Sequence, residues 1–126
     1  MGMQQTERGA LLPLILETAI RCFEEGGLEA LSMRRVAKQM GYTATTLYRY
    51  VENKEALIFA LVEEGFARFR VALHAAMSAH QEVRTRLWAL GRAYLDFAVH
   101  EPVYYRLMFM ERCDLTMRGL DPEQDA

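Results

Sequence analysis

The chain has 126 residues, of which 52% are hydrophobic, and a formal net charge of −2 at pH 7. This length suits one small domain, or one domain with part of a second, and the hydrophobic content is ample for a packed core. The acidic total argues against a protein that coats nucleic acid with its whole surface. No apolar run approaches the roughly 18 residues of a membrane-spanning helix and no signal-peptide pattern opens the chain, so we expect a cytoplasmic protein without a membrane partner.

Helical periodicity runs through the sequence, and no segment shows the alternation of a convincing strand. The first predicted helix covers residues 8–25 and buries an apolar face that includes Cys22 as a small hydrophobe. The pair Gly26 and Gly27 ends this helix. The sequence therefore predicts an all-α fold.

Two short helices joined by a tight turn follow within residues 32–54. Ser32 is the predicted N-cap of the first helix, and Gly41 supplies the left-handed residue that ends it. Thr43 is the predicted N-cap of the second, which we expect over residues 44–50. This arrangement is typical of a helix-turn-helix, whose second helix enters the DNA major groove.

The same segment carries a local excess of positive charge. Residues 32–54 contain five basic residues and one acidic residue, a net charge of +4. Residues 55–126 contain eight basic and eleven acidic residues, a net charge of −3. A basic face on an acidic body is typical of a protein that touches duplex DNA with one surface. An ordinary solvated helix pair explains the charges less well, because threonines and tyrosines stand among them.

Three further helices are predicted in the rest of the sequence. Asn53 is a good N-cap for a long helix with an apolar stripe, and a second helix covers about residues 81–100. Pro102 opens a third helix, which we expect to continue over residues 103–112. The polar residues 116–126 are expected to form no helix.

Residues 19–64, AIRCFEEGGLEALSMRRVAKQMGYTATTLYRYVENKEALIFALVEE, resemble the N-terminal domain of the TetR family of bacterial transcriptional regulators. The resemblance includes the pattern T-x-x-T-L-Y-x-Y and the N-K-E-A-L that opens the long helix. Residues 86–109 resemble, more weakly, the start of the C-terminal domain in one subgroup of that family. TetR-like regulators are usually longer, so we expect either a truncated chain or a compact relative that dimerises by other means.

The resemblance implies a three-helix DNA-binding head over residues 1–53 and a partial helical regulatory domain, for effector binding and dimerisation, over residues 54–126. It also implies that the complete protein is a homodimer on a palindromic double-stranded operator. We expect a repressor that a small apolar or aromatic effector releases. Ala44, and the pair Tyr50 and Val51, depart from the usual family residues, so the operator of a relative does not transfer to this chain.

The DNA contacts are assigned from side-chain chemistry and from the resemblance together. The Thr43 hydroxyl and the free N–H groups of its helix can bind a phosphate. The Arg49 guanidinium can bind N7 and O6 of guanine, a contact worth about 1–3 kcal/mol of discrimination. Core packing is an equal alternative for Tyr48, and Val36 and Leu47 are expected to be buried. The predicted DNA-binding residues are Arg34, Thr43, Thr45, Thr46, Tyr48, Arg49, Tyr50 and Lys54.

Aromatic residues and methionine gather in the last two predicted helices. They can line an apolar effector cavity, form ordinary core, or form an exposed half-interface, and core is the simplest of the three. By resemblance, a ligand in such a cavity would act on the long helix and change the spacing of two DNA-reading heads. The predicted effector-binding residues are Phe66, Trp88, Tyr94, Phe97, Tyr105 and Phe109.

Little in the sequence supports an enzyme. The three histidines lack the i, i+4 spacing of a helical metal pair, and neither a phosphate-binding glycine loop nor a nucleophile motif is present. We therefore predict no catalytic residue, no metal site and no cofactor. A helical interaction or structural module that has lost DNA binding is the remaining alternative, and the joint presence of Thr43, Arg49 and Lys54 disfavours it.

Overall fold

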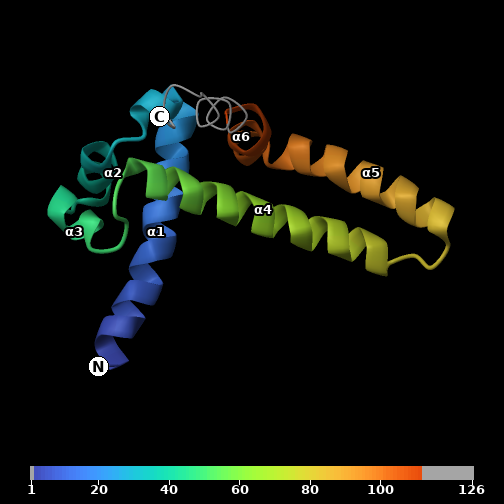
Figure 1. Cartoon of the computed structure of the whole chain (residues 1–126), viewed down its shortest axis with the longest axis horizontal. Coiled ribbons are helices and arrows are strands. Elements are labelled where there is room, and N and C mark those ends of the chain that lie inside the picture. Colours follow the sequence, from blue (N-terminus) through green and yellow to red (C-terminus); the bar gives the residue numbers. More distant parts are fainter. Residues whose placement is uncertain (1, 112–126) are drawn as a thin grey trace, which may run out of the picture. The chain divides into compact units, whose positions relative to one another are not determined.

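The computed structural model describes the backbone of residues 2–111 and the side chains of residues 11–111. All regular elements within this part are helical, which confirms the predicted all-α class (Figure 1). The chain divides into two compact units, Met1–Leu61 and Val62–Ala126. The division falls inside a long helix, and the expected domain boundary after residue 53 stays a prediction. The prediction for residues 116–126 lies outside the described residues.

The first unit opens with α1, Gly2–Gly26, followed by the 3₁₀ turn η1, Leu28–Ala30. The helix begins earlier than the predicted residue 8, because the preceding Met, Gln and Glu residues are good helix formers. Its buried face includes Ile15, Cys22 and Phe23, all with no exposed surface. Burial raises the pKa of the Cys22 thiol, and nearby Glu25 adds to the rise. Cys22 is thus the small buried hydrophobe that its apolar neighbours predict.

The next helix is α2, Met33–Met40, and its two ends are capped as predicted. The Ser32 hydroxyl accepts a hydrogen bond of 3.0 Å from the Arg35 amide at the N-terminus. Gly41 ends the helix at φ 77°, in the left-handed region where a side chain would be strained. The Tyr42 amide then donates to the Ala37 carbonyl over 2.8 Å, which closes the turn.

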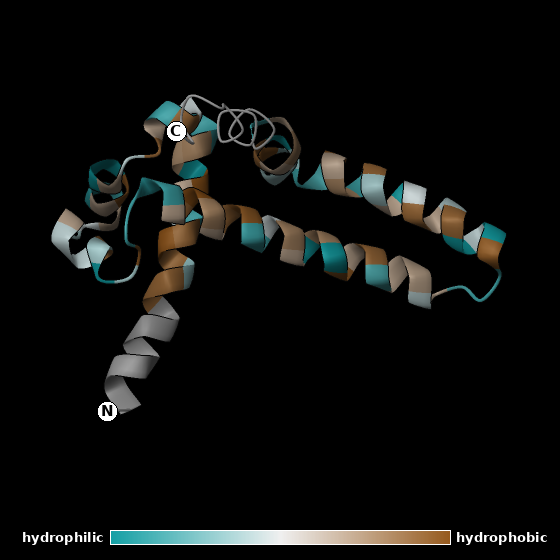
Figure 2. Ribbon diagram, viewed as in Figure 1, coloured by the Kyte–Doolittle hydropathy of each residue, from teal (hydrophilic) through white to brown (hydrophobic). Residues whose placement is uncertain are grey.

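A long helix, α4 (Lys54–Ser78), spans the boundary between the two units. It begins as expected, because Asn53 Oδ1 accepts from the Ala56 amide over 2.8 Å. The second unit continues with α5, Val83–His100, and α6, Pro102–Tyr105. Hydrophobic and hydrophilic residues alternate irregularly along α4 and α5 (Figure 2).

The last predicted helix differs from the one observed. After α6, the chain continues as a π-helical segment, η2, Arg106–Glu111, instead of one regular helix over residues 103–112. The wider π turn changes the angular spacing of successive side chains. Two consecutive residues, Leu107 and Met108, are both buried there.

Close backbone approach holds the second unit together at Gly65, a buried residue of α4. A Cβ atom at this position would lie 2.5 Å from Met108 Sδ and 3.1 Å from Tyr104 Cδ1. Only glycine therefore allows α4 to pack this closely against α6 and η2. Arg68, one turn further along, forms ion pairs of 3.1 Å with Glu64 and 3.3 Å with Glu101.

Candidate DNA-binding surface and aromatic cluster

The predicted reading helix is α3, Ala44–Tyr48, and it is shorter than the expected range of residues 44–50. The amides of Arg49 and Tyr50 bond to carbonyls three residues earlier, those of Thr46 and Leu47, over 3.2 and 2.9 Å. Such bonds tighten the end of a helix into a turn. Arg49 and Tyr50 therefore project from the turn that follows α3.

Hydroxyl groups organise the start of α3. Thr43 is the N-cap, and its Oγ1 accepts from the Thr46 amide over 3.3 Å. The two hydroxyls, Thr43 Oγ1 and Thr46 Oγ1, also lie 3.0 Å apart as a hydrogen-bonded pair. Thr45, between them, is exposed and makes no side-chain hydrogen bond with the residues that the structure describes. Thr45 is thus the threonine whose hydroxyl is most available to a ligand.

All eight predicted DNA-binding side chains reach the surface of the first unit. Tyr48 is 52% exposed, so it is a surface residue and not a core residue. Its neighbour Leu47 is fully buried, and so is Val36 of α2, as expected for the residues that hold the helix pair together. The exposed members of the predicted set are Arg34, Thr43, Thr45, Tyr48 and Arg49, and the half-buried members are Thr46, Tyr50 and Lys54.

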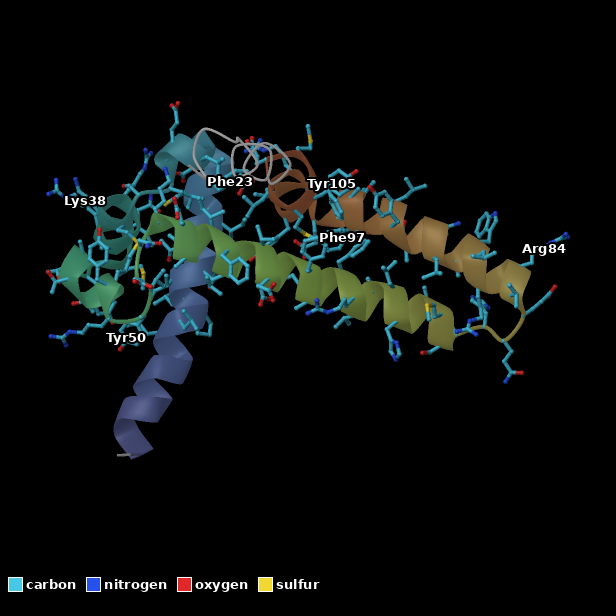
Figure 3. All side chains as sticks on the ribbon, in the orientation of Figure 1. Phe23, Lys38, Tyr50, Arg84, Phe97 and Tyr105 are labelled. Carbon is cyan, nitrogen blue, oxygen red and sulfur yellow. The ribbon has the colours of Figure 1, made fainter. Side chains whose placement is uncertain are left out.

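Carboxylates of the described residues do not neutralise the basic side chains of this surface. Arg34, Arg49 and Lys54 form no ion pair with any residue of the described part of the chain. Lys38 of α2 lies in the same segment of the sequence and is also exposed. Its side chain projects from the helix pair, as does that of Tyr50 (Figure 3). The positive charge is therefore free to attract phosphates.

Tyr42 is a surface residue that the sequence prediction missed. It lies in the turn between α2 and α3, directly before the Thr43 cap, and is 45% exposed. A large aromatic residue next to the N-cap of a reading helix is the signal that would have identified it. Its phenol adds a donor at the end of α3 where the helix N–H groups are free.

The second unit contains a cluster of aromatic rings, called here the aromatic cluster. Phe69 of α4 is at its centre, with ring centroids 5.2 Å from Phe97, 5.7 Å from Phe109 and 5.8 Å from Tyr94. These edge-to-face arrangements stabilise aromatic pairs beyond simple burial. The members of the cluster are Phe66, Phe69, Tyr94, Phe97, Tyr105 and Phe109.

Five of the six predicted effector-binding residues thus come together, and Trp88 does not join them. Trp88 is 69% exposed on α5, where the guanidinium of Arg92 lies 5.8 Å from its ring. The rings of the cluster pack against one another, as the core alternative expects. An open groove of about 380 Å³ borders the cluster at Phe97, and Arg68, His100 and Glu101 are among its polar lining residues.

One polar contact lies inside the aromatic cluster. The hydroxyls of Tyr94 and Tyr105 are 2.8 Å apart, and Figure 3 shows Tyr105 on α6, next to the end of α5. This hydrogen bond, together with partial desolvation, raises the pKa of Tyr94. The two hydroxyls thus offer the cluster a hydrogen-bond donor and an acceptor.

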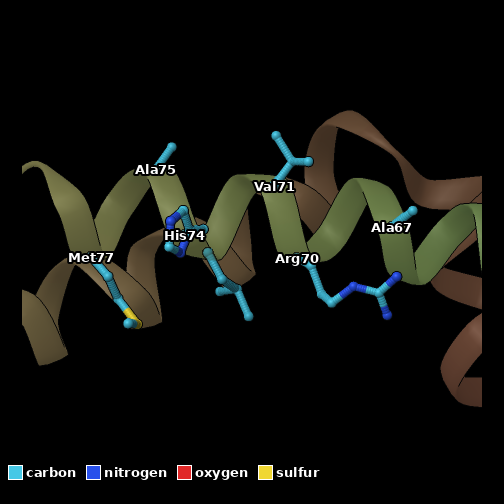
Figure 4. Close-up of a pocket in the computed structure, with 7 residues that line it drawn as sticks. Ala67, Arg70, Val71, His74, Ala75 and Met77 are labelled. Atoms are coloured by element: carbon cyan, nitrogen blue, oxygen red, sulfur yellow. The ribbon is translucent and has the colours of Figure 1, made fainter.

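A second open groove, of about 770 Å³, lies along α4 (Figure 4). Its lining is mostly small or apolar, with Arg70 and His74 as polar members. The described residues contain no group of three or more side chains placed to hold a metal ion. None of the helices described is long and apolar enough to cross a membrane.

Comparison with known proteins identifies the first unit. Residues 15–61 match the family described as bacterial regulatory proteins, tetR family. Over 85 residues the chain is 33% identical to the class D tetracycline repressor protein of Escherichia coli, a match that covers 66% of this chain and 39% of the repressor. Over 74 residues it is 36% identical to the HTH-type transcriptional regulator UidR of Escherichia coli strain K12, covering 56% and 38%. The chain thus spans less than half the length of these curated relatives.

Solved structures share the fold beyond this domain. The fatty acid degradation regulator FadR from Bacillus halodurans matches with a TM-score of 0.72 at 22% identity, over 83% of this chain and 56% of that one. The ketosteroid transcriptional regulator KstR2 of Mycobacterium tuberculosis matches with a TM-score of 0.65 at 22% identity, over 83% and 51%. The tetR family consists of DNA-binding transcriptional regulators and not of enzymes. Residues 15–61 of this chain therefore match the N-terminal helix-turn-helix domain of the TetR family of bacterial regulators.

Proposed function

We propose that this protein binds a specific double-stranded operator through α3 and the turn after it, and acts as a cytoplasmic transcriptional repressor. The observation that carries the proposal is a set of exposed or half-buried basic side chains around a capped reading helix, none of which forms an ion pair with a described residue. Phosphate contacts give affinity and position, whereas contacts with base edges give sequence preference. The two kinds of contact are assigned to different residues of this surface.

Arg49 and Thr45 are the proposed base-reading residues. Both side chains are exposed, and Thr45 has a hydroxyl that no described neighbour occupies. An arginine can bind guanine with two hydrogen bonds, and a threonine methyl can contact the methyl group of thymine. Thr46 has a smaller role in base reading, because its hydroxyl already bonds to Thr43 over 3.0 Å.

Lys54, Arg34 and Thr43 are the proposed phosphate-binding residues. Lys54 and Arg34 each supply a positive charge, and Thr43 stands at the N-terminus of α3 where backbone N–H groups are free. Tyr48 and Tyr50 are assigned to the DNA backbone or to thymine methyl groups. Tyr42 joins this group because its phenol is exposed at the same end of α3.

The test measures binding to the DNA upstream of the protein's own gene by fluorescence anisotropy over a range of salt concentrations. The affinity should fall steeply with salt, because each phosphate contact releases counterions. Arg49→Ala should lower the preference for the operator over random DNA by about tenfold to a hundredfold. Lys54→Ala should weaken binding to all sequences about equally and reduce the salt slope by about 1.

Arg70→Ala is the matched control, because Arg70 is an exposed arginine of the second unit. It should leave both the affinity and the sequence preference unchanged. Sequence-specific binding that survives the removal of both Arg49 and Lys54 would contradict the assignment. Absence of any salt-dependent DNA binding would favour the alternative, a helical interaction module that has lost DNA binding.

A small apolar or aromatic effector is the proposed inducer, and the aromatic cluster with its bordering groove is the proposed site. The rings provide an apolar surface, and the hydroxyl pair of Tyr94 and Tyr105 can orient one polar group of a ligand. A ligand shifts the equilibrium only by its differential affinity for the two states, so the inducer must prefer the DNA-free form. A thermal-shift screen of hydrophobic compounds, followed by operator competition, tests this. Hits that stabilise the protein but leave operator affinity unchanged would contradict induction through this site.

A further inference from the structure

The groove that borders the aromatic cluster, called here the Asp96 groove, is lined by residues of both α4 and α5 and has a volume of about 380 Å³. This volume is near the lower end of the range for pockets that hold small molecules. Ala72 of α4 and Ala93 of α5 line the groove and leave space that larger side chains would fill. Phe97 projects from α5 toward α4 and supplies an aromatic wall (Figure 3). The groove therefore has room for a small apolar body.

The charged groups that line the Asp96 groove sum to a negative charge. They are two carboxylates, Asp96 and Glu101, and one guanidinium, Arg68, a net charge of −1 with His100 neutral. The positive charge of Arg68 is also shared with a third carboxylate, because Arg68 forms an ion pair of 3.1 Å with Glu64. Electrostatic complementarity therefore favours a cationic ligand over an anionic one.

The two carboxylates of the groove differ in what already binds them. Asp96 is exposed, and its carboxylate forms neither an ion pair nor a hydrogen bond with any residue that the structure describes. The Glu101 carboxylate accepts from Arg68 over 3.3 Å, which is longer than the roughly 2.7–3.2 Å of a typical N–H···O bond. Asp96 is thus the more available acceptor for a ligand, and Glu101 is the second.

Arg68 shows how the protein holds an organic cation of its own beside the groove. Its guanidinium carbon lies 4.6 Å from the centroid of the Tyr104 ring, and its N–H groups bond to the carboxylates of Glu64 and Glu101. Carboxylates and aromatic rings are also the groups that recognise ammonium ligands. The Arg68 side chain is 45% exposed, so a second cation can approach Glu101 from solvent and compete with it.

We propose that the effector of this protein is an amphipathic amine. Its protonated amino group binds the Asp96 carboxylate, and its aromatic or aliphatic body lies against Phe97 between α4 and α5. Glu101 is the second acceptor of the amino group, in competition with Arg68. This inference rests on the proposed function, because it gives the chemical class of the effector for the same site. A carboxylate ligand of equal size would instead meet the net negative charge of the groove.

The test compares three probes that share one apolar body and differ in the end group: 4-phenylbutylamine, 4-phenylbutan-1-ol and 4-phenylbutanoate. Protein NMR titration of the whole chain at pH 7 and low salt, without DNA, measures the three dissociation constants. The amine should bind with a dissociation constant on the order of 0.1–1 mM, because the groove is small and open. The alcohol should bind about threefold to fivefold more weakly, and the carboxylate at least about tenfold more weakly. The preference for the amine should shrink as salt is added, because salt screens exposed charges.

Asp96→Asn tests the principal contact, because it removes the charge and keeps the shape of the side chain. It should weaken amine binding to about the level of the alcohol and leave alcohol binding unchanged. Glu63→Gln is the matched control, since Glu63 is an exposed carboxylate of α4 that does not line the groove. It should leave the dissociation constants of all three probes unchanged.

Arg68→Gln tests the competition for Glu101 and has the opposite sign. It removes the cation that bonds to Glu101, so it should tighten amine binding by about twofold to fivefold. The same substitution removes two ion pairs and the contact with Tyr104, so its effect on thermal unfolding should be unfavourable. Weaker amine binding in folded Arg68→Gln would contradict the competition. Far-UV circular dichroism of every variant confirms that the helices remain folded.

Four outcomes would overturn the inference: no binding of the amine, equal affinity for the three probes, tightest binding of the carboxylate, or an amine preference that survives Asp96→Asn. Operator release is measured separately, by fluorescence anisotropy of labelled operator with the amine present. Amine binding that depends on Asp96 but leaves operator affinity unchanged would support the ligand class and contradict induction. The ligand class and the proposed function can therefore fail independently.

Discussion

The two units of the chain bury their apolar residues to different degrees. Of the buried apolar residues in the described part of the chain, fourteen lie between Ile15 and Leu61, and five lie between Val62 and Met108. In the first unit, the helix pair encloses fully buried residues such as Val36 and Leu47. In the second, packing depends on edge-to-face rings and on the close helix approach at Gly65, while one side of α5 stays exposed.

This difference indicates which unit has a self-contained apolar core. The first unit has a core of its own, and its turns are fixed by caps formed within a few residues, such as Ser32 with Arg35. The second unit leaves several large apolar side chains of α5 exposed, among them Leu87, Trp88 and Leu95. Substitutions should therefore affect the two units differently. In the first unit, the stability lost should come from local hydrogen bonds, and in the second it should come from contacts between residues distant in sequence.

The largest loss of stability is expected for a substitution at the centre of the aromatic cluster. Phe69→Ala removes ring contacts with Phe66, Tyr94, Phe97 and Phe109. It should lower the free energy of unfolding by about 2–4 kcal/mol, somewhat less than for a fully buried phenylalanine because Phe69 is half-buried. Urea unfolding followed by circular dichroism measures the change.

Phe59→Ala is the control for this substitution. Phe59 lies on the same helix, α4, and is 64% exposed. Its removal should change the free energy of unfolding by less than about 0.5 kcal/mol. Equal losses in the two variants would show that the aromatic cluster does not hold the second unit together.

The next largest change in stability is expected when alanine replaces one of two helical glycines, Gly65 or Gly91. Gly65→Ala places a methyl group 2.5 Å from Met108 Sδ, and we expect a net loss of about 1–2 kcal/mol even after the gain in helix propensity. Gly91→Ala meets nothing within 4 Å and should stabilise the chain by about 0.5–1 kcal/mol. Thermal unfolding measures the melting temperature of both variants. A change of the same sign in both melting temperatures would contradict the close approach at Gly65.

A smaller effect is expected at the caps of the first unit. Ser32→Ala and Thr43→Ala should each cost about 1 kcal/mol, because each removes the acceptor for an amide at a helix N-terminus. Thr43→Ser keeps the hydroxyl and should cost less than half as much. The free energies of unfolding, measured in urea, compare these variants, and an equal cost for Thr43→Ser and Thr43→Ala would exclude a capping role.

The smallest effect is expected at the hydroxyl pair of the second unit. Tyr94→Phe removes the hydrogen bond to Tyr105 and should lower the melting temperature slightly. Because the folded-state pKa of Tyr94 is raised, the pair stabilises the fold fully below the ordinary tyrosine value near 10, and this contribution is lost as pH rises through the raised pKa. Melting curves from pH 8 to 11 should therefore fall more steeply in the original protein than in Tyr94→Phe. Parallel curves would contradict a stabilising role for the pair.

The sequence predicted best the features that depend on near neighbours. The caps at Ser32 and Thr43, the left-handed Gly41 and the start of α4 at Asn53 all follow from hydrogen bonds over three or four residues. The same local reasoning, with the family resemblance, identified the helix-turn-helix domain.

The features that were missed depend on contacts between distant segments. Trp88 and Tyr94 look alike as aromatic residues of one helix, and only packing against α4 and η2 decides that Tyr94 joins the cluster and Trp88 does not. The π-helical turn of η2 likewise leaves no signal in the periodicity of the sequence, which predicted one regular helix there. Periodicity in one helix does not specify which of its faces a distant segment will cover.

Hydrogen–deuterium exchange of the whole chain tests the comparison between the units most directly. Amide protection reports local opening along the chain. We predict that the helical amides of residues 33–58, which surround the buried core of the first unit, are protected more strongly than those of residues 83–99. Equal protection of the two segments, or stronger protection of α5, would contradict the account.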